Sequence, residues 1–134
     1  MTALLKFKDD VLNDETFAEF ARVRVIKKNE DNKIVLRFPK LTTTKLRSIY
    51  SMIMNLYTAI DNKDDFEKHK PDIQYLKVKM AYEAGREQAV KEFLTDTLLM
   101  AALNYVKTYE HFLLYCRYAE SLVAYFKFYD GKDN

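Results

Sequence analysis

The amino-acid sequence predicts an all-α fold, a compact bundle of about five helices. The chain of 134 residues contains only two glycines and two prolines. Tight turns consume both residue types, so their scarcity argues against an all-β fold. Several segments repeat apolar residues at spacings of three and four, which is the pattern of a helix with one buried face. A chain of this length is expected to form one domain over residues 1–134.

The first forty residues give the weakest structural signals. Residues 1–13 are mixed in character and are expected to be loosely ordered. Asp14 is a candidate N-cap for a first helix, although the β-branched residues at 23–26 would also suit a strand. Residues 29–41 are expected to form a loop. Within it, residues 34–38 alternate like a short strand but have no clear partner with which to pair.

The second helix carries the first unambiguous apolar stripe, and it is expected to be long. Thr42, Thr43 and Thr44 are candidate N-caps. The stripe comprises Leu46, Ile49, Tyr50, Ile53, Leu56, Tyr57 and Ile60. The charged residues 61–71 that follow are expected to form a second loop.

The third helix is also expected to be long, and it begins at Pro71 and Asp72. Its apolar face comprises Ile73, Leu76, Met80 and Ala84, and Tyr75, Val78 and Tyr82 are expected to widen that face. Residues 87–104 predict one or two further helical stretches. A long C-terminal helix then repeats Tyr109, Phe112, Cys116, Ala119, Val123 and Phe126 and is expected to stop at Gly131.

Few residues of the chain are suited to catalysis or metal binding. The only cysteine, Cys116, lies on the apolar stripe of the last helix and is expected to be buried. His69 and His111 have no partner at the spacing that a helical metal site needs. Two glycines cannot build a phosphate-binding loop. We therefore expect no catalytic residue, no metal and no cofactor.

The cysteine count and the hydropathy pattern indicate a cytoplasmic protein. One cysteine allows no disulfide framework within the chain, which fits a reducing compartment. The sequence contains no apolar run of about 18 residues that could span a membrane. Residues 1–10 are too short and too charged to be a signal peptide.

The net charge of +2 does not indicate nucleic-acid binding, but the charge is unevenly distributed. Residues 41–60 contain two bases and no acid, whereas residues 61–72 contain five acids and three bases. On the last helix, basic residues beside the apolar stripe are interleaved with Tyr118 and Tyr125. Cations for phosphates and flat rings for bases are what a surface for single-stranded nucleic acid needs. By itself this pattern is common in helical domains.

Three segments of the chain carry motifs that are typical of one known protein family. Residues 43–52 read TTKLRSIYSM and are similar to the T-x-K-[IL]-R start of that family's main helix. Residues 75–87 read YLKVKMAYEAGRE, close to the family pattern YL+V+xxYEAGRE, in which + is Lys or Arg.

The third segment begins at Phe112 and resembles the C-terminal tail of the same family. It contains RY at 117–118, LVAYFK at 122–127 and the closing YDGKD at 129–133. Asp130 departs from the pattern, because the family usually has the first glycine of a closing pair there. The three segments follow one another in the order of that family, and the chain thus resembles the small subunit of the type III-A CRISPR–Cas effector, the Csm complex.

The resemblance implies a helical, non-catalytic subunit, several copies of which stack along the inside of a ribonucleoprotein. In this family the copies line the groove that holds the crRNA paired with target RNA. The backbone subunits cut target RNA, and the large subunit makes cyclic oligoadenylate and cleaves DNA. The expected partners are therefore crRNA and target RNA, single-stranded or guide-paired, together with other Csm subunits and further copies of this chain, in antiviral defence.

Six basic residues inside the three segments are candidates for RNA binding or for salt bridges between subunits: Lys45, Arg47, Lys77, Lys79, Arg86 and Arg117. Contacts that hold for any guide sequence have to be made to phosphates. Two candidates have alternatives, since Lys79 could pair with Glu83 and Arg86 could clamp a helix end. The alternative function is that of a helical adaptor that contacts proteins and no nucleic acid.

Overall fold

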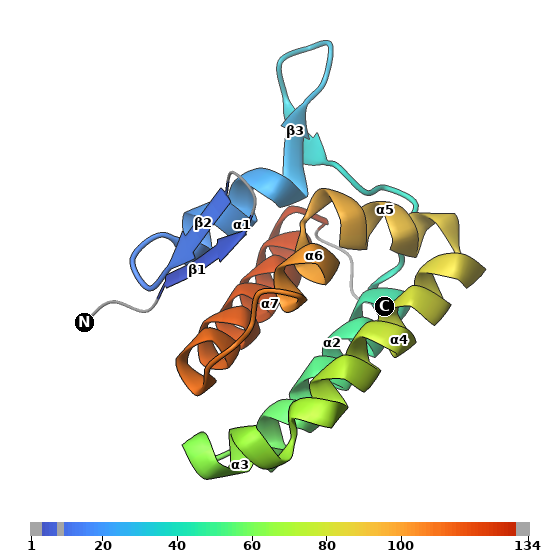
Figure 1. Cartoon of the computed structure of the whole chain (residues 1–134). Coiled ribbons are helices and arrows are strands. Elements are labelled where there is room, and N and C mark those ends of the chain that lie inside the picture. The colour runs from blue at the N-terminus through green and yellow to red at the C-terminus, as the bar shows by residue number, and fades with distance from the viewer. Residues whose placement is uncertain (1–3, 8–9, 131–134) are drawn as a thin grey trace.

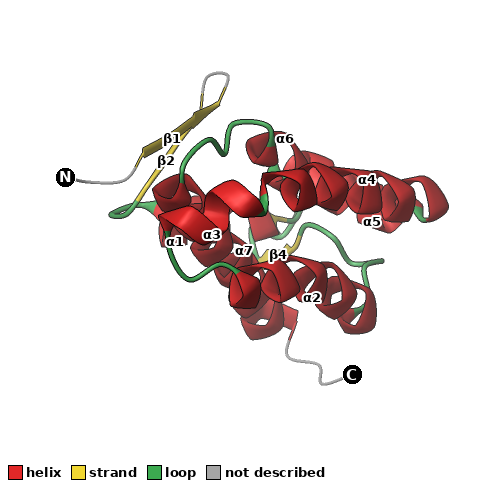
Figure 2. Ribbon diagram, turned by 60° about the horizontal axis from the view of Figure 1, so that its bottom comes forward, coloured by secondary structure: helices red, strands yellow, loops and turns green. Residues whose placement is uncertain are grey.

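The computed structural model of the chain describes residues 4–7 and 10–130. Within these ranges the protein is predominantly helical, with seven helices and two small two-stranded antiparallel sheets (Figures 1 and 2). The helical character predicted from the sequence is confirmed. The strictly all-α class and the number of about five helices are wrong, because two hairpins and the short helix within residues 61–71 were not foreseen.

The elements follow one another along the chain without a long unstructured stretch. In order they are β1 (Leu4–Phe7), β2 (Asp10–Asn13), α1 (Phe17–Val25), β3 (Ile26–Lys28), β4 (Ile34–Leu36), α2 (Thr43–Ala59), α3 (Lys63–Lys68), α4 (Lys70–Arg86), α5 (Gln88–Asp96), α6 (Leu99–Leu103) and α7 (Tyr109–Asp130).

The segment expected to be loosely ordered contains the hairpin of β1 and β2, so that expectation is wrong for its described residues. Leu5 pairs with Leu12, and both side chains are completely buried, while their neighbours Leu4 and Val11 are exposed. This alternation is that of strands with one buried face. Both strands lie beside helices, since β1 contacts α6 and α7 and β2 contacts α1. Residues 1–3 and 8–9 lie outside the described part of the chain.

Helix α1 is capped differently from the sequence prediction, in which Asp14 was the candidate. The side-chain oxygen of Asn13 accepts hydrogen bonds from the backbone N–H groups of Glu15 and Thr16, at 2.8 and 3.0 Å. Thr16 precedes the first helical residue, and its side chain makes no capping hydrogen bond. An Asx turn at the end of β2 therefore leads the chain into the helix.

The predicted loop at 29–41 contains strand β4, whose partner β3 was hidden at the end of α1. Ile26 pairs with Leu36 and Lys28 with Ile34. The turn between them is held by the Asn29 side chain, which accepts from the N–H groups of Asp31 and Lys33. Residues 34–38 did alternate like a strand, but the partner β3 was not recognised, because its three residues continue directly from α1 and are too few to show a period of two.

Helices α2 and α4 form as predicted, and the loop expected between them at 61–71 is shorter than predicted. The Thr42 side chain accepts from the N–H of Lys45 at 3.1 Å and so caps α2. The charged run contains α3, capped by Asn62, whose oxygen accepts from the N–H of Asp65 at 2.8 Å. Phe66, the apolar residue of this short helix, is buried against the ring of Phe112.

Helix α7 lies at the centre of the fold, in contact with α1, α2, α6, β1 and β4. The predicted stripe is confirmed, with Phe112, Cys116, Ala119 and Phe126 buried. A second set of buried residues flanks it: Leu114, Tyr115, Tyr118 and Leu122. Tyr118 was expected on the surface, and that expectation is wrong. Gly131, the predicted stop, lies outside the described residues.

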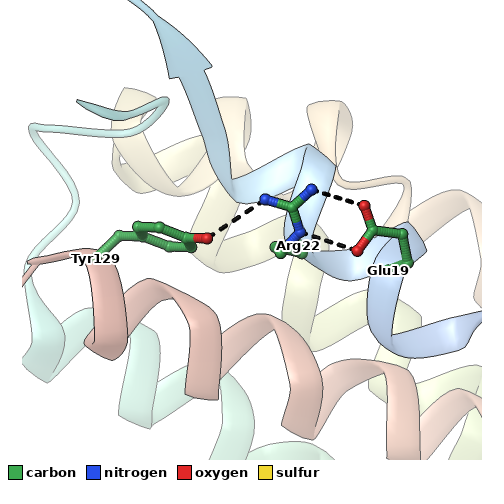
Figure 3. Close-up of polar contacts among 3 residues, drawn as sticks. All are labelled: Glu19, Arg22 and Tyr129. Carbon is green, nitrogen blue, oxygen red and sulfur yellow. Dashed lines mark hydrogen bonds and ion pairs between the residues drawn. The ribbon is translucent and has the colours of Figure 1, made fainter. Parts of the chain in front are cut away.

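Arg22 ties α1 to the C-terminal end of α7, as the close-up in Figure 3 shows. Its guanidinium donates to both carboxylate oxygens of Glu19, at 2.9 and 2.7 Å, and to the hydroxyl of Tyr129 at 3.4 Å. The hydrogen bond to Arg22 lowers the pKa of the Glu19 carboxyl. The contact joins two residues, Arg22 and Tyr129, that lie 107 positions apart in the sequence.

Candidate functional site

The six candidate cations lie at three places on the molecule. Lys45 and Arg47 belong to the first turns of α2. The ammonium of Lys45 lies 3.2 Å from a carboxylate oxygen of Glu87, the residue between α4 and α5. Arg47 is exposed on the same helix. Lys45 therefore links the start of α2 to the junction of two other helices.

The most exposed face of α4 carries two pairs of an aromatic ring and a cation. Tyr75 and Tyr82 expose 58% and 63% of their surface. The ammonium of Lys79 lies 5.0 Å from the ring centre of Tyr75, and the guanidinium of Arg86 lies 5.3 Å from that of Tyr82. We call these four residues the α4 ridge. Their spacings of four, three and four place them on one side of the helix.

The buried face of α4 lies on the other side of the helix. Ile73, Leu76 and Met80 are buried against the core. Residues two apart on a helix point about 200° apart, so Tyr75 points away from the core that holds Ile73. The prediction that Tyr75, Val78 and Tyr82 widen the apolar face is therefore wrong, and all three are strongly exposed.

Lys77 does not belong to the α4 ridge. It is half-buried, and its ammonium donates to the side-chain oxygen of Gln74 at 3.4 Å. The alternative pairing of Lys79 with Glu83 is not what the structure contains, because Glu83 lies 3.5 Å from Arg86 and Lys79 lies over Tyr75. Arg86 forms an ion pair with Glu83 on the same helix, and its alternative role as a clamp of the helix end stays a prediction.

A groove of about 230 Å³ runs between α2 and α4 beside the ridge, and Tyr75 and Lys79 belong to both. Its apolar lining includes Met52, Leu56, Ala59 and Leu76, and its polar lining includes Asn55, His69 and Asp72. His69 and Asp72 share a hydrogen bond of 2.7 Å. An apolar floor with a few polar groups and a cation at its edge is suited to an amphipathic ligand such as a nucleotide.

Arg117 lies on a different surface. Its guanidinium is 3.6 Å from a carboxylate oxygen of Asp14, and it lines a groove between α2 and α7 with Tyr50 and Tyr57. On α2, residues 50, 54 and 57 line this groove, whereas residues 52, 55 and 59 line the groove beside α4. At about 100° per residue these sets face opposite sides of α2. Arg117 and the α4 ridge are therefore separated by a helix.

The side chains best suited to nucleophilic or acid–base chemistry are held in structural roles. Cys116 is buried, and burial raises the pKa of its thiol to about 12, so that the thiol is protonated at neutral pH. A ring nitrogen of His111 accepts from the backbone N–H of Lys107. Within residues 4–7 and 10–130, the structure contains no group of three or more His, Cys, Asp or Glu residues placed to hold a metal ion.

The α4 ridge was not predicted from the sequence, which indicated its two cations but not the exposure of its two rings. Lys79 and Arg86 were singled out, but their ring partners were assigned to the core. The spacing contained the missing signal, because Tyr75, Lys79, Tyr82 and Arg86 repeat as two pairs of Tyr and cation, each four residues apart. Such pairs on one helix face contact each other when that face is exposed.

Comparison with known proteins relates most of the chain to one family. The family described as Csm2 Type III-A matches residues 23–132, which include all six candidate cations. The chain is 42% identical to the CRISPR system Cms protein Csm2 of Enterococcus italicus over 110 residues, covering 78% of this chain and 79% of that protein.

Two further relatives bear the same name. The Streptococcus thermophilus protein is 37% identical over 123 residues, covering 92% of this chain and 98% of the relative. A Mycobacterium tuberculosis protein is 38% identical over 98 residues, covering 70% and 79%. No described helix of this chain is long and apolar enough to cross a membrane.

Proposed function

The chain belongs to the Csm2 family, the small subunits of type III-A CRISPR complexes, and from this we propose that it lines the groove that holds crRNA and target RNA. In that role it binds RNA without catalysing a reaction and contributes to antiviral defence. Its partners are the two RNAs, other Csm subunits and further copies of itself along the complex. The location that fits this role is the cytoplasm.

The observation that carries the proposal is the α4 ridge. Its two tyrosine rings are among the most exposed apolar groups of the described chain, and each has a cation beside it. Exposed rings next to cations allow bases to stack while phosphates are neutralised, and neither contact depends on sequence. A subunit that accommodates any guide needs contacts of this kind.

A non-catalytic role is supported by the state of the reactive groups. Cys116 is the only thiol of the chain, and its raised pKa removes the thiolate at neutral pH. The hydroxyls of Tyr115 and Tyr118 are engaged with the backbone carbonyls of Leu99 and Thr97. These groups stabilise the fold, and the chemistry of the complex is left to other subunits.

We propose the other four cations, Lys45, Arg47, Lys77 and Arg117, as further contacts to RNA or to neighbouring subunits. Lys45 and Arg117 have carboxylate partners in this structure, at 3.2 and 3.6 Å. An exposed ion pair contributes only about 0–1 kcal/mol, so a phosphate can replace the carboxylate at little cost. Arg117 would then serve a surface separate from the ridge.

The proposal is tested by removing the two ridge cations. We expect the variant Lys79→Gln, Arg86→Gln to bind labelled RNA roughly tenfold more weakly than the unchanged chain at low salt, because two phosphate contacts are lost. The matched control is Lys68→Gln, Lys91→Gln, which removes two exposed lysines from α3 and α5. Fluorescence anisotropy measures the affinity of the purified chain, and filter retention measures target RNA held by the reassembled complex.

A second variant tests the rings alone. Tyr75→Leu with Tyr82→Leu keeps both cations and removes the stacking surfaces, which contribute about 1–3 kcal/mol per base. We expect weaker binding of single-stranded RNA with an unchanged dependence on salt. RNA binding that is the same for the unchanged chain, both variants and the control would contradict the ridge as an RNA surface.

The alternative, an adaptor that contacts only proteins, is favoured by one observation. Val78 and Phe128 expose 58% and 73% of their surface, and exposed apolar groups suit protein contacts. If the chain is an adaptor, the ridge variants should be lost from the assembled complex. RNA should then leave the melting temperature of the purified chain unchanged. The proposed RNA-binding role predicts that RNA raises this melting temperature.

A further inference from the structure

The hairpin of β3 and β4 extends away from the helices, as Figure 1 shows at the top of the molecule. Its base is anchored, because Ile26 and Leu36 pack against the core and β4 contacts α7. Arg37 closes the base by donating through its side chain to the carbonyl oxygen of Ile26 at 3.0 Å and through its N–H to that of Val25 at 2.8 Å. The hairpin is thus a fixed projection of the core.

The tip of the hairpin has a defined conformation. The N–H of Asn29 donates to the carbonyl oxygen of Lys33, and the N–H of Asn32 donates to that of Asn29, both at 2.9 Å. Asn32 adopts φ of 62°, in the left-handed region that Asn tolerates better than most residues. Since the Asn29 side chain also accepts two backbone hydrogen bonds, the side chains around the tip are presented on an ordered backbone.

Exposed cations surround this projection. They are Lys27, Lys28, Lys33, Arg37 and Lys40, against the two acids Glu30 and Asp31 in the same stretch. Lys27 and Lys28 are successive residues of a strand, so they point to opposite faces and make both faces basic.

The lysines of this stretch, Lys27, Lys28, Lys33 and Lys40, have no carboxylate partner among the described residues. By contrast, Lys45, Lys63, Lys70, Arg86 and Arg117 each lie within 4 Å of an acid. The hairpin stretch therefore keeps a net positive charge, with five cations against two acids and no ion pair on its lysines.

We propose that this hairpin is a second RNA contact, a basic finger that binds phosphates through Lys27, Lys28 and Lys33. The inference rests on the proposed RNA-binding function and adds a site outside the six candidate cations. A rigid projection with lysines on both faces can contact phosphates on two sides, whereas the α4 ridge offers rings and cations on one helix face. The ligand is the RNA backbone, in a single strand or in the guide-paired duplex.

Lysines on the strands of an exposed hairpin also discourage pairing with other chains. That function needs any charge at the edge, whereas phosphate binding needs positive charge. The two are distinguished by comparing Lys→Gln with Lys→Arg substitutions at the same three positions, because the Arg variant keeps the charge that phosphates require.

The test measures how RNA affinity depends on salt for the purified full chain. The probes are a labelled single-stranded RNA and an RNA duplex of equal length. For Lys27→Gln, Lys28→Gln, Lys33→Gln, the slope of log affinity against log salt should become shallower by about 2 on the single strand and about 3 on the duplex, as three phosphate contacts are lost. The Arg variant should retain the slope. The control is Lys68→Gln, Lys91→Gln, Lys107→Gln, three exposed lysines on other elements.

Each outcome decides between the two proposals. If the slope changes on one probe and not on the other, the result supports the finger and shows whether its phosphates belong to a single strand or to a duplex. If the finger variant behaves like the scattered control while the ridge variants still weaken binding, the finger is overturned and the proposed function stands. If the unchanged chain binds neither probe, both are overturned. If the finger variant binds RNA normally but is lost from the assembled complex, the hairpin contacts protein, and the proposal is wrong.

Discussion

Tyr118 and Tyr82 place the same residue type in opposite environments. Tyr118 is fully buried in α7, where its ring meets that of Phe20 edge-on at 5.4 Å. Its hydroxyl donates to the carbonyl oxygen of Thr97, and burial raises its pKa. Tyr82 exposes most of its ring on α4. The sequence pattern put Tyr118 on the surface and Tyr82 on the apolar face, and the structure reverses both, because burial depends on which helices pack together.

The hydroxyl of Tyr118 provides a test at the scale of one atom. Tyr118→Phe keeps the ring and leaves the carbonyl of Thr97 without its partner in a dry interior. We expect the free energy of unfolding to fall by about 1–3 kcal/mol. Urea denaturation measures it, with Tyr82→Phe as the matched control, for which we expect a change within about 0.5 kcal/mol. Equal effects of the two substitutions would show that the buried hydrogen bond adds no stability.

At the scale of elements, α2 was well predicted because several signals agree. Three threonines precede a stripe with regular helical spacing, and the structure selects Thr42 as the cap. Thr43 is buried inside the first turn, and Thr44 is exposed. The sequence left three candidates because the side chains are alike. The geometry distinguishes them, since only the residue before the helix can accept from the third helical N–H.

Replacing each of two threonines tests that assignment. Thr42→Ala removes the side-chain oxygen that accepts from Lys45 N–H and should destabilise the protein by about 1 kcal/mol. Thr44→Ala, two residues on, should change stability by less than about 0.5 kcal/mol. Thermal unfolding followed by circular dichroism compares the two variants. A larger effect at Thr44 would mean that α2 begins later than the structure indicates.

Short elements and helix faces were the parts that the sequence could not predict. Strand β4 lies in a segment that alternates like a strand, but its partner β3 has three residues at the end of α1, too few for an alternating pattern to stand out. Helix α3 is one charged stretch around a single buried residue, Phe66, so it looked like a loop. On α4, apolar Tyr75 was counted with the core although its angle places it opposite. The apolar ring of Tyr75 suggested that this residue is buried. Its angular position on α4 and the packing of α2 against α4 show instead that it is exposed.

At the scale of the whole molecule, the candidate RNA contacts are distributed around a fixed core. The α4 ridge, Arg117 and the basic finger are carried by different elements, and α2 separates the first two. Helix α7 contacts elements from both ends of the chain, including α1, α2 and β4. An array of such subunits could hold an RNA on more than one side, because the relative positions of these surfaces are set by one shared core.

The core extends beyond the region that matches the family. The match begins at residue 23, whereas Leu5 and Leu12 of the first hairpin are completely buried. Strand β1 contacts α6 and α7, so the hairpin covers the central helix. If these contacts stabilise the fold, the segment before residue 23 is part of the structural unit, whatever role it has in the complex.

Leu12→Ala tests whether the hairpin belongs to the core. Truncating a fully buried leucine removes its transfer free energy and leaves a cavity, which costs about 2–5 kcal/mol. The neighbouring residue Val11 points to the other face of β2 and is exposed, so Val11→Ala should cost less than about 1 kcal/mol. Urea unfolding of both variants measures the difference. The Leu12 variant should unfold at lower urea in a single transition, since its cavity lies in the one buried core that also includes residues of α7 and weakens the whole fold. A small effect equal to that of Val11→Ala would show that the hairpin docks without contributing to stability.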